Sequence, residues 1–384
     1  MIKEKLYDVV RRAPFMQSYR QKRQVNRTKS CMLSEKDIIS AEKDYESKKN
    51  ILLNYKNRFP EKSEMLVKDI NAVLDAQHYT SEEKKEIAED MFFYYFAYGF
   101  SPYEYMGYEF PTKSKEERLE FESERGSICY GYSMNNIDTV RLLSNKNATY
   151  NLLKKYFRRE TISIKTNEDK DKFMSFIERH SVFVRKLVDE SCGRSVEKVD
   201  INKIECTTEQ LFELYISQGE NIIEQLVVQN EIMSKINASS VNTIRCITVR
   251  TKNGLETPFC FLKAGRAGAF VDNGGAGGIL VGIDEKTGVL NTDGYDELNR
   301  RYEYHPDSQI KFIGYELPKW EEMIDMCKEM ANLIPDARFI GWDTAYTDDG
   351  WVVIEGNAIS EVIGPQITSK KGIKLSLEKY LKAK

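Results

Sequence analysis

Hydrophobic and polar positions follow a helical period in residues 1–125 and predict a mainly helical region there. The clearest helix is predicted at residues 80–100, where Thr80 and Glu83 have the spacing of a capping box. The aromatic residues that follow them lie on one helical stripe and are expected in the core. A second helix is predicted at residues 114–124.

The pattern changes in residues 126–384, where helix-like segments alternate with short β-branched runs. The predicted helices are residues 147–157, 169–180, 208–217 and 375–381. The predicted strands lie in SVFVRKLV, NIIEQLVV, TIRCITVR and WVVIEGN. Glycines concentrate in residues 264–284. Mixed strands and helices with glycine-rich turns indicate an α+β domain of a kind that binds nucleotides.

The stretch GWDTAYTDDGWVVIEGNA, residues 341–358, predicts a β-hairpin, because Asp-Asp-Gly separates two apolar, β-prone segments. Glu355 and Asn357 are two residues apart and therefore point to the same face of their strand. If Asp343 lies on that face of the partner strand, three oxygen ligands converge, as a hard cation such as Mg²⁺ requires. The alternative is a solvated hairpin whose acidic residues face water.

The composition is that of an ordinary globular protein of two or three domains, with 41% hydrophobic and 30% charged residues among 384. The net charge of −3 gives no reason to expect a nucleic-acid partner. Residues 1–29, however, hold nine Lys or Arg against Glu4 and Asp8. Such a basic N-terminus is suited to contact with an anionic membrane or a polyanionic partner, although a solvated terminus is the simpler interpretation.

Seven scattered cysteines without a CxxC pair argue against a disulfide framework and a zinc site, and they suit a reducing cytoplasm. No apolar segment typical of a signal peptide follows the first charges. The most apolar aromatic run, residues 91–100, is too short to span a bilayer. We therefore expect a cytoplasmic protein.

Two further segments have the chemistry of a nucleotide site. Residues 181–201 predict a strand through Lys186, a polar turn and a returning strand, so that a lysine and turn amides could meet phosphate. Arg185 points to the opposite face, and alternation alone leaves open which cation faces inward. The apolar run ending in Glu224-Gln225-Leu226-Val227 predicts either a hinge against adenine or a buried strand with a polar end.

Arg245 opens the most β-prone run, and Arg266 lies in the glycine-rich segment that follows. Either arginine could neutralise the charge that develops on a transferring phosphoryl group, or it could lie on a solvated strand face. The glycines of residues 274–278 would let the backbone approach a ligand closely. No GxGxxG opens a helix and no GxxxxGK[ST] occurs, so neither a Rossmann nor a P-loop site is predicted.

The order of these motifs resembles the ATP-grasp superfamily, and more narrowly the sugar-transfer-associated ATP-grasp family encoded with bacterial polysaccharide genes. The resembling motifs, across about residues 95–370, are YGFSPYEYMGYEF, SVNTIRCITV, GRAGAFVDNGGAGGILVGID and GWDTAYTDDGWVVIEGNA. The resemblance implies an ATP-grasp fold, in which two α+β subdomains grip ATP, at residues 126–384 behind the helical region of residues 1–125.

The resemblance also implies roles for individual residues, with ATP and Mg²⁺ as the cofactors. The implied ATP-binding residues are Lys146, Lys186, Glu224, Gln225, Leu226, Val227 and, for the ribose, Glu231. The implied Mg²⁺ ligands are Asp343, Glu355 and Asn357. Arg245 and Arg266 would hold phosphate or an anionic substrate. The turn after Lys186 has one glycine, Gly193, where many ATP-grasp enzymes have several.

The activity implied is that of a ligase, which activates a small-molecule carboxylate as an acyl phosphate for attack by an amine or sugar acceptor. The expected bond is carbon–nitrogen, and the expected setting is polysaccharide or sugar-conjugate biosynthesis. One alternative keeps the fold but makes the protein a kinase of a sugar or small metabolite. Another is a non-catalytic ATP-binding partner of a glycosyltransferase, docked through the basic N-terminus.

Overall fold

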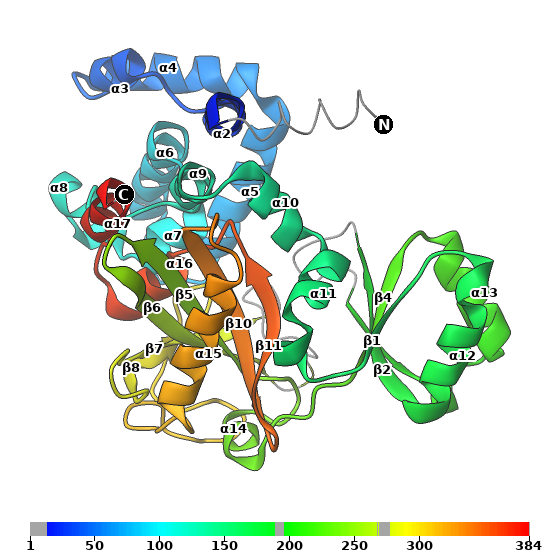
Figure 1. The fold of residues 1–384 in the computed structure, drawn as a ribbon. Helices are drawn as coiled ribbons and strands as arrows, with labels where there is room; N and C mark the ends of the chain where they lie inside the picture. The colour runs from blue at the N-terminus through cyan, green and yellow to red at the C-terminus, as the bar shows by residue number, and fades with distance from the viewer. Residues whose placement is uncertain (1–13, 189–195, 267, 269–276, 384) are drawn as a thin grey trace.

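The structure, a computed structural model, describes residues 14–188, 196–266, 268 and 277–383. It contains a helical N-terminal region, a small four-stranded sheet and a larger seven-stranded sheet (Figure 1). The predicted α+β class is therefore confirmed. Within the described ranges, no helix is long and apolar enough to cross a membrane.

The N-terminal region packs its helices around a core rich in aromatic side chains. Its helices are α2 (Pro14–Thr28), α3 (Glu35–Ala41), α4 (Tyr45–Arg58), α5 (Pro60–Asp75), α6 (Ser81–Tyr98), α7 (Pro102–Gly107), η1 (Phe110–Thr112), α8 (Lys115–Arg118) and α9 (Glu124–Met134). The helix predicted at residues 80–100 is confirmed as α6. Thr80 caps it by accepting from the Glu83 N–H, and the Glu83 carboxylate accepts from the Thr80 N–H, which is the predicted capping box.

The helix predicted at residues 114–124 is wrong beyond its first turn. Ser114 caps α8 as a helix start should, but α8 ends at Arg118. Ser123 then accepts a hydrogen bond from the Gly126 N–H and begins α9 in a new direction. A second capping residue inside the polar run therefore divides what the pattern predicted as one helix. The predicted domain boundary, residue 125, falls in the first turn of α9.

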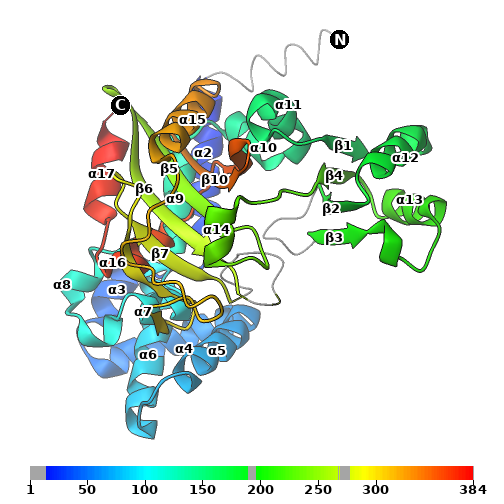
Figure 2. The ribbon, with the colours of Figure 1, turned by 90° about the horizontal axis from the view of Figure 1, so that it is seen from below.

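The small sheet is antiparallel, in the order β1-β4-β2-β3, and joins the rest of the molecule at its side (Figure 2). Its strands are β1 (Thr161–Ile164), β2 (Val182–Leu187), β3 (Glu197–Asp200) and β4 (Asn221–Gln225), and its helices are η2 (Asn167–Asp169), α12 (Lys170–Arg179), η3 (Ile201–Lys203) and α13 (Thr208–Ser217). Phe183 and Ile223 pack beneath α12 and α13. The predicted hairpin at residues 181–201 is confirmed as β2–β3, although Gly193 lies outside the described residues.

The large sheet is antiparallel, in the order β11-β10-β5-β6-β7-β8-β9. Its strands are β5 (Thr243–Thr251), β6 (Gly254–Ala264), β7 (Ile279–Ile283), β8 (Leu290–Tyr295), β9 (Arg301–Tyr302), β10 (Phe339–Thr347) and β11 (Gly350–Asn357). The remaining helices are α10 (Ile137–Ser144), α11 (Lys146–Phe157), α14 (Glu231–Ile236), α15 (Trp320–Asn332), α16 (Ile363–Ser369) and α17 (Lys374–Lys382). The hairpin predicted at residues 341–358 is confirmed as β10–β11.

Helices cover both faces of the large sheet. Trp342 packs with Met323 of α15 on one face, whereas Phe339 packs with Tyr130 of α9 and with α17 on the other. Because alternate residues of a strand point to opposite faces, Asp343 shares the face of Phe339. The carboxylate of Asp343 is therefore directed away from α15.

Candidate functional site

Asp343 is buried between two cations near the middle of β10. Its strand partner on β5 is Arg245, whose Nε and second terminal nitrogen lie 2.6 and 2.9 Å from the two carboxylate oxygens. Lys263 of β6 places its Nζ 3.1 Å from Asp343 Oδ1. The three side chains belong to residues that are only 2%, 9% and 8% exposed. Their charges therefore act on one another with little screening by water.

The two cations decide the charge state of Asp343. Burial alone would raise the pKa of the Asp343 carboxyl, but the positive charges of Arg245 and Lys263 outweigh burial and hold that pKa well below its usual range. Burial would lower the pKa of Arg245, and the charge of Asp343 reverses this and raises it. Asp343 and Arg245 are therefore both ionised at neutral pH.

Glu355 and Asn357 complete the predicted metal set on the neighbouring strand. Glu355 is the strand partner of Asp343, and the Asn357 Nδ2 donates to Glu355 Oε1 at 3.0 Å. Glu355 is exposed, whereas Asp343 is buried. The structure therefore brings the three predicted Mg²⁺ ligands together at one end of the hairpin.

Mg²⁺ fits this donor set in part. The oxygens of Glu355 and Asn357 are the hard ligands that Mg²⁺ prefers, and one or two protein carboxylates are its usual complement. Both oxygens of Asp343 accept hydrogen bonds from cations. Asp343 would thus share its oxygens between Mg²⁺ and its cationic partners. In the part of the chain that is described, no group of three or more His, Cys, Asp or Glu side chains is placed to hold a metal by itself.

A second charged cluster lies on the small sheet, where β2 and β4 are neighbours. Lys186 Nζ is 3.0 Å from Glu224 Oε2, and Arg159 Nε donates to the same oxygen at 3.1 Å. Burial would raise the pKa of Glu224, but the charges of Arg159 and Lys186 outweigh burial and lower it to about 2. Lys186 is therefore the cation on the face of β2 that Glu224 and Arg159 share. Arg185 lies on the opposite face, over the Tyr215 ring at 4.4 Å.

Arg159 links the second cluster to β11 of the large sheet. Besides Glu224, its guanidinium donates to the carbonyl oxygens of Val353 at 2.7 Å and Ile354 at 3.3 Å in β11. Ile354 directly precedes Glu355. One buried arginine therefore connects the Lys186–Glu224 pair of the small sheet to the strand that carries Glu355 and Asn357.

The predicted adenine hinge follows β4. The strand ends at Gln225, and Asn230, which caps α14, donates its N–H to Tyr346 of β10 at 2.9 Å. Between these anchors Leu226 and Val227 are half-buried. Their main-chain amides and carbonyls make no hydrogen bond to another described residue. The segment thus offers apolar side chains together with free main-chain groups, which is what recognition of a base edge requires.

Of two other predicted ATP-binding residues, one is hydrogen-bonded to the main chain of the small sheet and the other is exposed. Lys146, the first residue of α11, donates from Nζ to the carbonyl oxygens of Leu187 at 3.0 Å and Val188 at 3.3 Å, at the end of β2. Glu231 begins α14, where its largely exposed carboxylate lies 3.6 Å from Lys235 Nζ. Lys146 is therefore close to β2, and the ribose role of Glu231 stays a prediction.

Arg266 follows β6 and is half-buried, with its guanidinium 5.7 Å from the centre of the Tyr302 ring. Among the described residues, the Arg266 guanidinium forms no hydrogen bond or ion pair with Asp343, Arg245 or Lys263. Most of the glycine-rich segment beside it, residues 267 and 269–276, lies outside the described residues. Its predicted phosphate role stays a prediction.

Lys263 and Arg159 were not identified from the sequence. Lys263 has a recognisable signal, because it is a single cation in the otherwise apolar strand end FCFLKAG. Arg159 follows α11 in a polar stretch, and nothing local distinguishes it from Arg158, which is exposed. Its role depends on contacts with strands almost 200 residues away in sequence.

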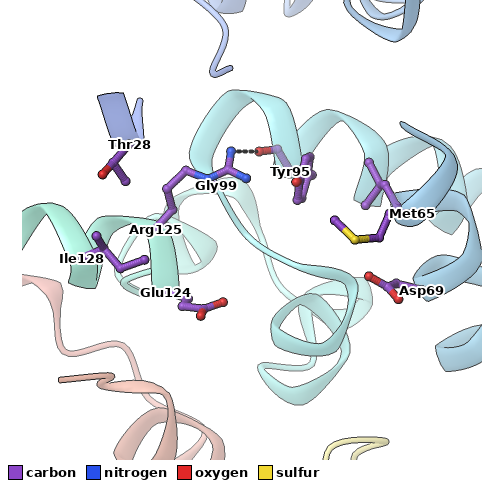
Figure 3. Close-up of a pocket in the computed structure, with 9 residues that line it drawn as sticks. Thr28, Met65, Asp69, Tyr95, Gly99, Glu124, Arg125 and Ile128 are labelled. Atoms are coloured by element: carbon purple, nitrogen blue, oxygen red, sulfur yellow. Dashed lines mark hydrogen bonds between the residues drawn. The ribbon is translucent and has the colours of Figure 1, made fainter. Parts of the chain in front are cut away.

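A pocket of about 300 Å³ lies elsewhere, between α5, α6 and α9 (Figure 3). It is lined by Thr28, Met65, Leu66, Asp69, Tyr95, Gly99, Glu124, Arg125 and Ile128. Arg125 extends over the Tyr95 ring at 4.6 Å and donates to the Tyr95 carbonyl at 3.4 Å. None of the predicted site residues lines this pocket.

Comparison with known proteins identifies a family. The model of the family described as sugar-transfer associated ATP-grasp matches residues 127–382. No curated protein sequence matches the chain.

Several solved structures resemble the chain at low identity. The ATP-grasp ligase PsnB, complexed with a phosphomimetic variant of a minimal precursor, Mg and ADP, is 14% identical, with a TM-score of 0.41 over 68% of this chain and 66% of that one. D-alanine-D-alanine ligase from Helicobacter pylori is 13% identical, with a TM-score of 0.40 over 65% and 61%. N5-carboxyaminoimidazole synthetase from Staphylococcus aureus, complexed with ADP, is 14% identical, with a TM-score of 0.37 over 60% and 48%. The chain thus covers less than two thirds of each of these proteins.

Proposed function

The chain belongs to the sugar-transfer associated ATP-grasp family, and from this premise we propose that it is an ATP- and Mg²⁺-dependent ligase. Its substrates would be a small-molecule carboxylate and an amine or sugar acceptor, and the bond formed would be carbon–nitrogen. The polysaccharide or sugar-conjugate setting of the reaction rests on the family alone. The ATP-grasp fold with an N-terminal helical region, expected from the motifs, is the fold of the chain.

The observation that carries the proposal is the junction at Arg159. Lys186 and Glu224 approach it from the small sheet, and the strand that bears Glu355 and Asn357 approaches it from the large sheet. A nucleotide held at the hinge of residues 226–227 would therefore have cations on one side and metal ligands on the other. These are the groups that phosphoryl transfer needs, because such transfer depends on positioning and charge neutralisation.

Each group then has a role that its position supports. Leu226 and Val227 would contact adenine, and Lys186 would exchange its bond to Glu224 for one to phosphate. Glu355 and Asn357, together with Asp343, would hold Mg²⁺, which when bound neutralises charge on the phosphates. Lys146 would reach the phosphates from the start of α11.

The proposed reaction has two steps. A carboxylate oxygen of the first substrate attacks the γ-phosphorus of ATP, the bond from that phosphorus to the bridging oxygen breaks, and ADP leaves. The acceptor nitrogen then attacks the acyl carbon, the carbon–oxygen bond to phosphate breaks, and the nitrogen loses a proton. Arg266, or Arg245 through its hold on Asp343, would stabilise the transferring group.

Thermal melting with Mg²⁺ and a non-hydrolysable ATP analogue tests the site. A ligand that binds only the folded chain adds about 2.7 kcal/mol of stability at about a hundredfold excess over its Kd. We expect this rise in the wild type and its loss in Glu355→Ala/Asn357→Ala. The control is Asp349→Ala, in the exposed turn of the same hairpin. Absence of the rise in the wild type would refute the nucleotide site.

Product analysis tests the chemistry. A ligase releases phosphate only when both the carboxylate and the acceptor are present. A kinase instead yields ADP and a phosphorylated hydroxyl compound without free phosphate. A non-catalytic partner of a glycosyltransferase binds ATP without turnover. Phosphate release that requires both substrates supports the proposal. Kinase products, or ATP binding without turnover, would contradict it.

A further inference from the structure

Helix α2 is attached to the protein through polar side chains. Gln17 Nε2 donates to Asp138 Oδ2 at 2.8 Å, and Arg20 lies 3.3 Å from the other oxygen of that carboxylate. Gln21 Nε2 donates to the carbonyl oxygen of Asn135 at 2.7 Å. The three residues are spaced for one face of a helix. This docked face is thus defined by Gln17, Arg20 and Gln21, and it rests on α9 and α10 (Figure 1).

The outer face of α2 carries its aromatic residues. Phe15 is 68% exposed and Tyr19 is 61% exposed, one helical turn apart. Lys22, Arg23 and Arg27, all exposed, continue the same stripe at spacings of three and four residues. A single exposed aromatic residue is ordinary on a protein surface. Two in register with three cations form a continuous stripe, which we call the outer stripe of α2.

The charged residues around α2 are all basic, because residues 9–34 contain no Asp or Glu. Arg20 is engaged with Asp138 on the docked face. The three cations of the outer stripe form no ion pair with any described residue. Among the described residues nothing neutralises these exposed cations, and they suit an external anionic surface.

We propose that the outer stripe of α2 docks the protein on an anionic lipid bilayer. A helix that lies on a bilayer places aromatic residues at headgroup level and keeps lysine and arginine near anionic lipids. The outer stripe has both components on one side, and the docked face keeps the helix parallel to the protein surface. Each cation near such a bilayer contributes about 1 kcal/mol, an attraction that salt screens. The binding is peripheral and reversible, because few apolar groups enter the lipid.

Co-sedimentation of the full chain with vesicles tests the inference without nucleotide or substrate, so its outcome is separate from that of the proposed ligase. Vesicles of phosphatidylcholine with phosphatidylglycerol supply the anionic surface, and pure phosphatidylcholine is the neutral comparison. We expect binding only to the anionic vesicles, falling as salt rises. Lys22→Gln/Arg23→Gln should lower the partition coefficient about thirtyfold, which is two cations at about 1 kcal/mol each.

The matched control is Lys154→Gln/Lys155→Gln, which removes two adjacent exposed cations from α11. It should leave vesicle binding unchanged. Phe15→Ala/Tyr19→Ala should weaken binding at all salt concentrations, and unchanged melting temperatures would show that these variants fold. Equal binding to neutral vesicles, equal loss in the control variant, or no vesicle binding would each overturn the proposal. If vesicles fail but the stripe variants lose a protein partner such as a glycosyltransferase, the stripe is a protein-docking face instead.

Discussion

Asp343 and Arg245 form a two-point ion pair across neighbouring strands of the large sheet, with nitrogen–oxygen distances of 2.6 and 2.9 Å. Lys263 adds a second cation to the same carboxylate. The pair has two consequences. It fixes the orientation of Asp343, a predicted metal ligand. It also makes the stability of the buried Arg245 charge depend on the Asp343 carboxylate.

Replacement of Asp343 should therefore destabilise the fold as well as the site. Asp343→Asn removes the carboxylate charge that pairs with buried Arg245, and breaking such a pair costs about 3–5 kcal/mol. Urea unfolding measures the loss. Asp349→Asn, an exposed change in the turn of the same hairpin, should shift the unfolding free energy by less than about 0.5 kcal/mol. Equal effects of the two changes would contradict the buried ion pair.

Gly341 lies where a side chain would displace this pair. A Cβ at Gly341 would approach the Cβ of Ser360 to 2.7 Å and the Cδ of Arg245 to 3.1 Å. Gly341→Ala should cost about 1–3 kcal/mol in unfolding free energy, because the neighbours must move. Adding Ser360→Gly should restore part of the loss by removing the closest side chain. A double variant no more stable than Gly341→Ala would show that the crowding has another source.

The low pKa of Glu224 predicts a pH dependence. Because the folded pKa of about 2 lies below the ordinary value of 4.5, the stabilisation from ionised Glu224 is complete above pH 4.5. It is lost as pH falls from 4.5 towards 2. The difference in unfolding free energy between the wild type and Glu224→Gln should thus shrink over that range, by about 3 kcal/mol in all.

Denaturant titrations at intervals between pH 2 and 7 measure this difference. Glu231→Gln provides the control, because its carboxylate is largely exposed and is paired only within α14. A Glu224→Gln difference that does not change with pH would mean that Glu224 does not hold its charge through Arg159 and Lys186.

Truncation at the predicted hinge should weaken nucleotide binding. In the proposed site, Leu226→Ala and Val227→Ala would each remove apolar contact with adenine worth about 1–2 kcal/mol, which is about tenfold in Kd for the ATP analogue. Val228→Ala is the matched control, because Val228 is 71% exposed in the same segment. Titration calorimetry gives the three Kd values. Equal losses at all three positions would show that the segment acts through flexibility and not through contact.

Local signals account for the parts of the fold that the sequence predicted well. The capping box of Thr80 and the turn of the β10–β11 hairpin each depend on residues within a few positions of one another. The helix predicted at residues 114–124 failed because Ser123, which caps the start of α9, lies inside a run of helix-like composition. The small sheet's hairpin was predicted correctly, but the inward cation was not decided. That choice depends on α12 and α13 covering the Arg185 face.

The candidate site was predictable only where its residues lie in one motif. Asp343, Glu355 and Asn357 belong to one hairpin, so their meeting follows from strand pairing. Lys263 reaches Asp343 through the register of β5 with β6 and β10, which no short segment encodes. The contact of Arg159 with β11 likewise requires the position of one sheet relative to the other.

The position of Arg159 also makes the two sheets energetically interdependent. One guanidinium holds Glu224 on the small sheet and two carbonyl groups of β11 on the large sheet. A ligand that takes Lys186 away from Glu224 leaves Arg159 as the remaining cation on that carboxylate. The change alters how strongly Arg159 holds the carbonyl groups of β11, the strand that carries Glu355. Linkage requires the reverse as well, so that a cation bound at Glu355 changes affinity at Lys186 by the same factor. In the proposed site, nucleotide and Mg²⁺ should accordingly bind with mutual cooperativity, with Arg159 as the link between the two sheets.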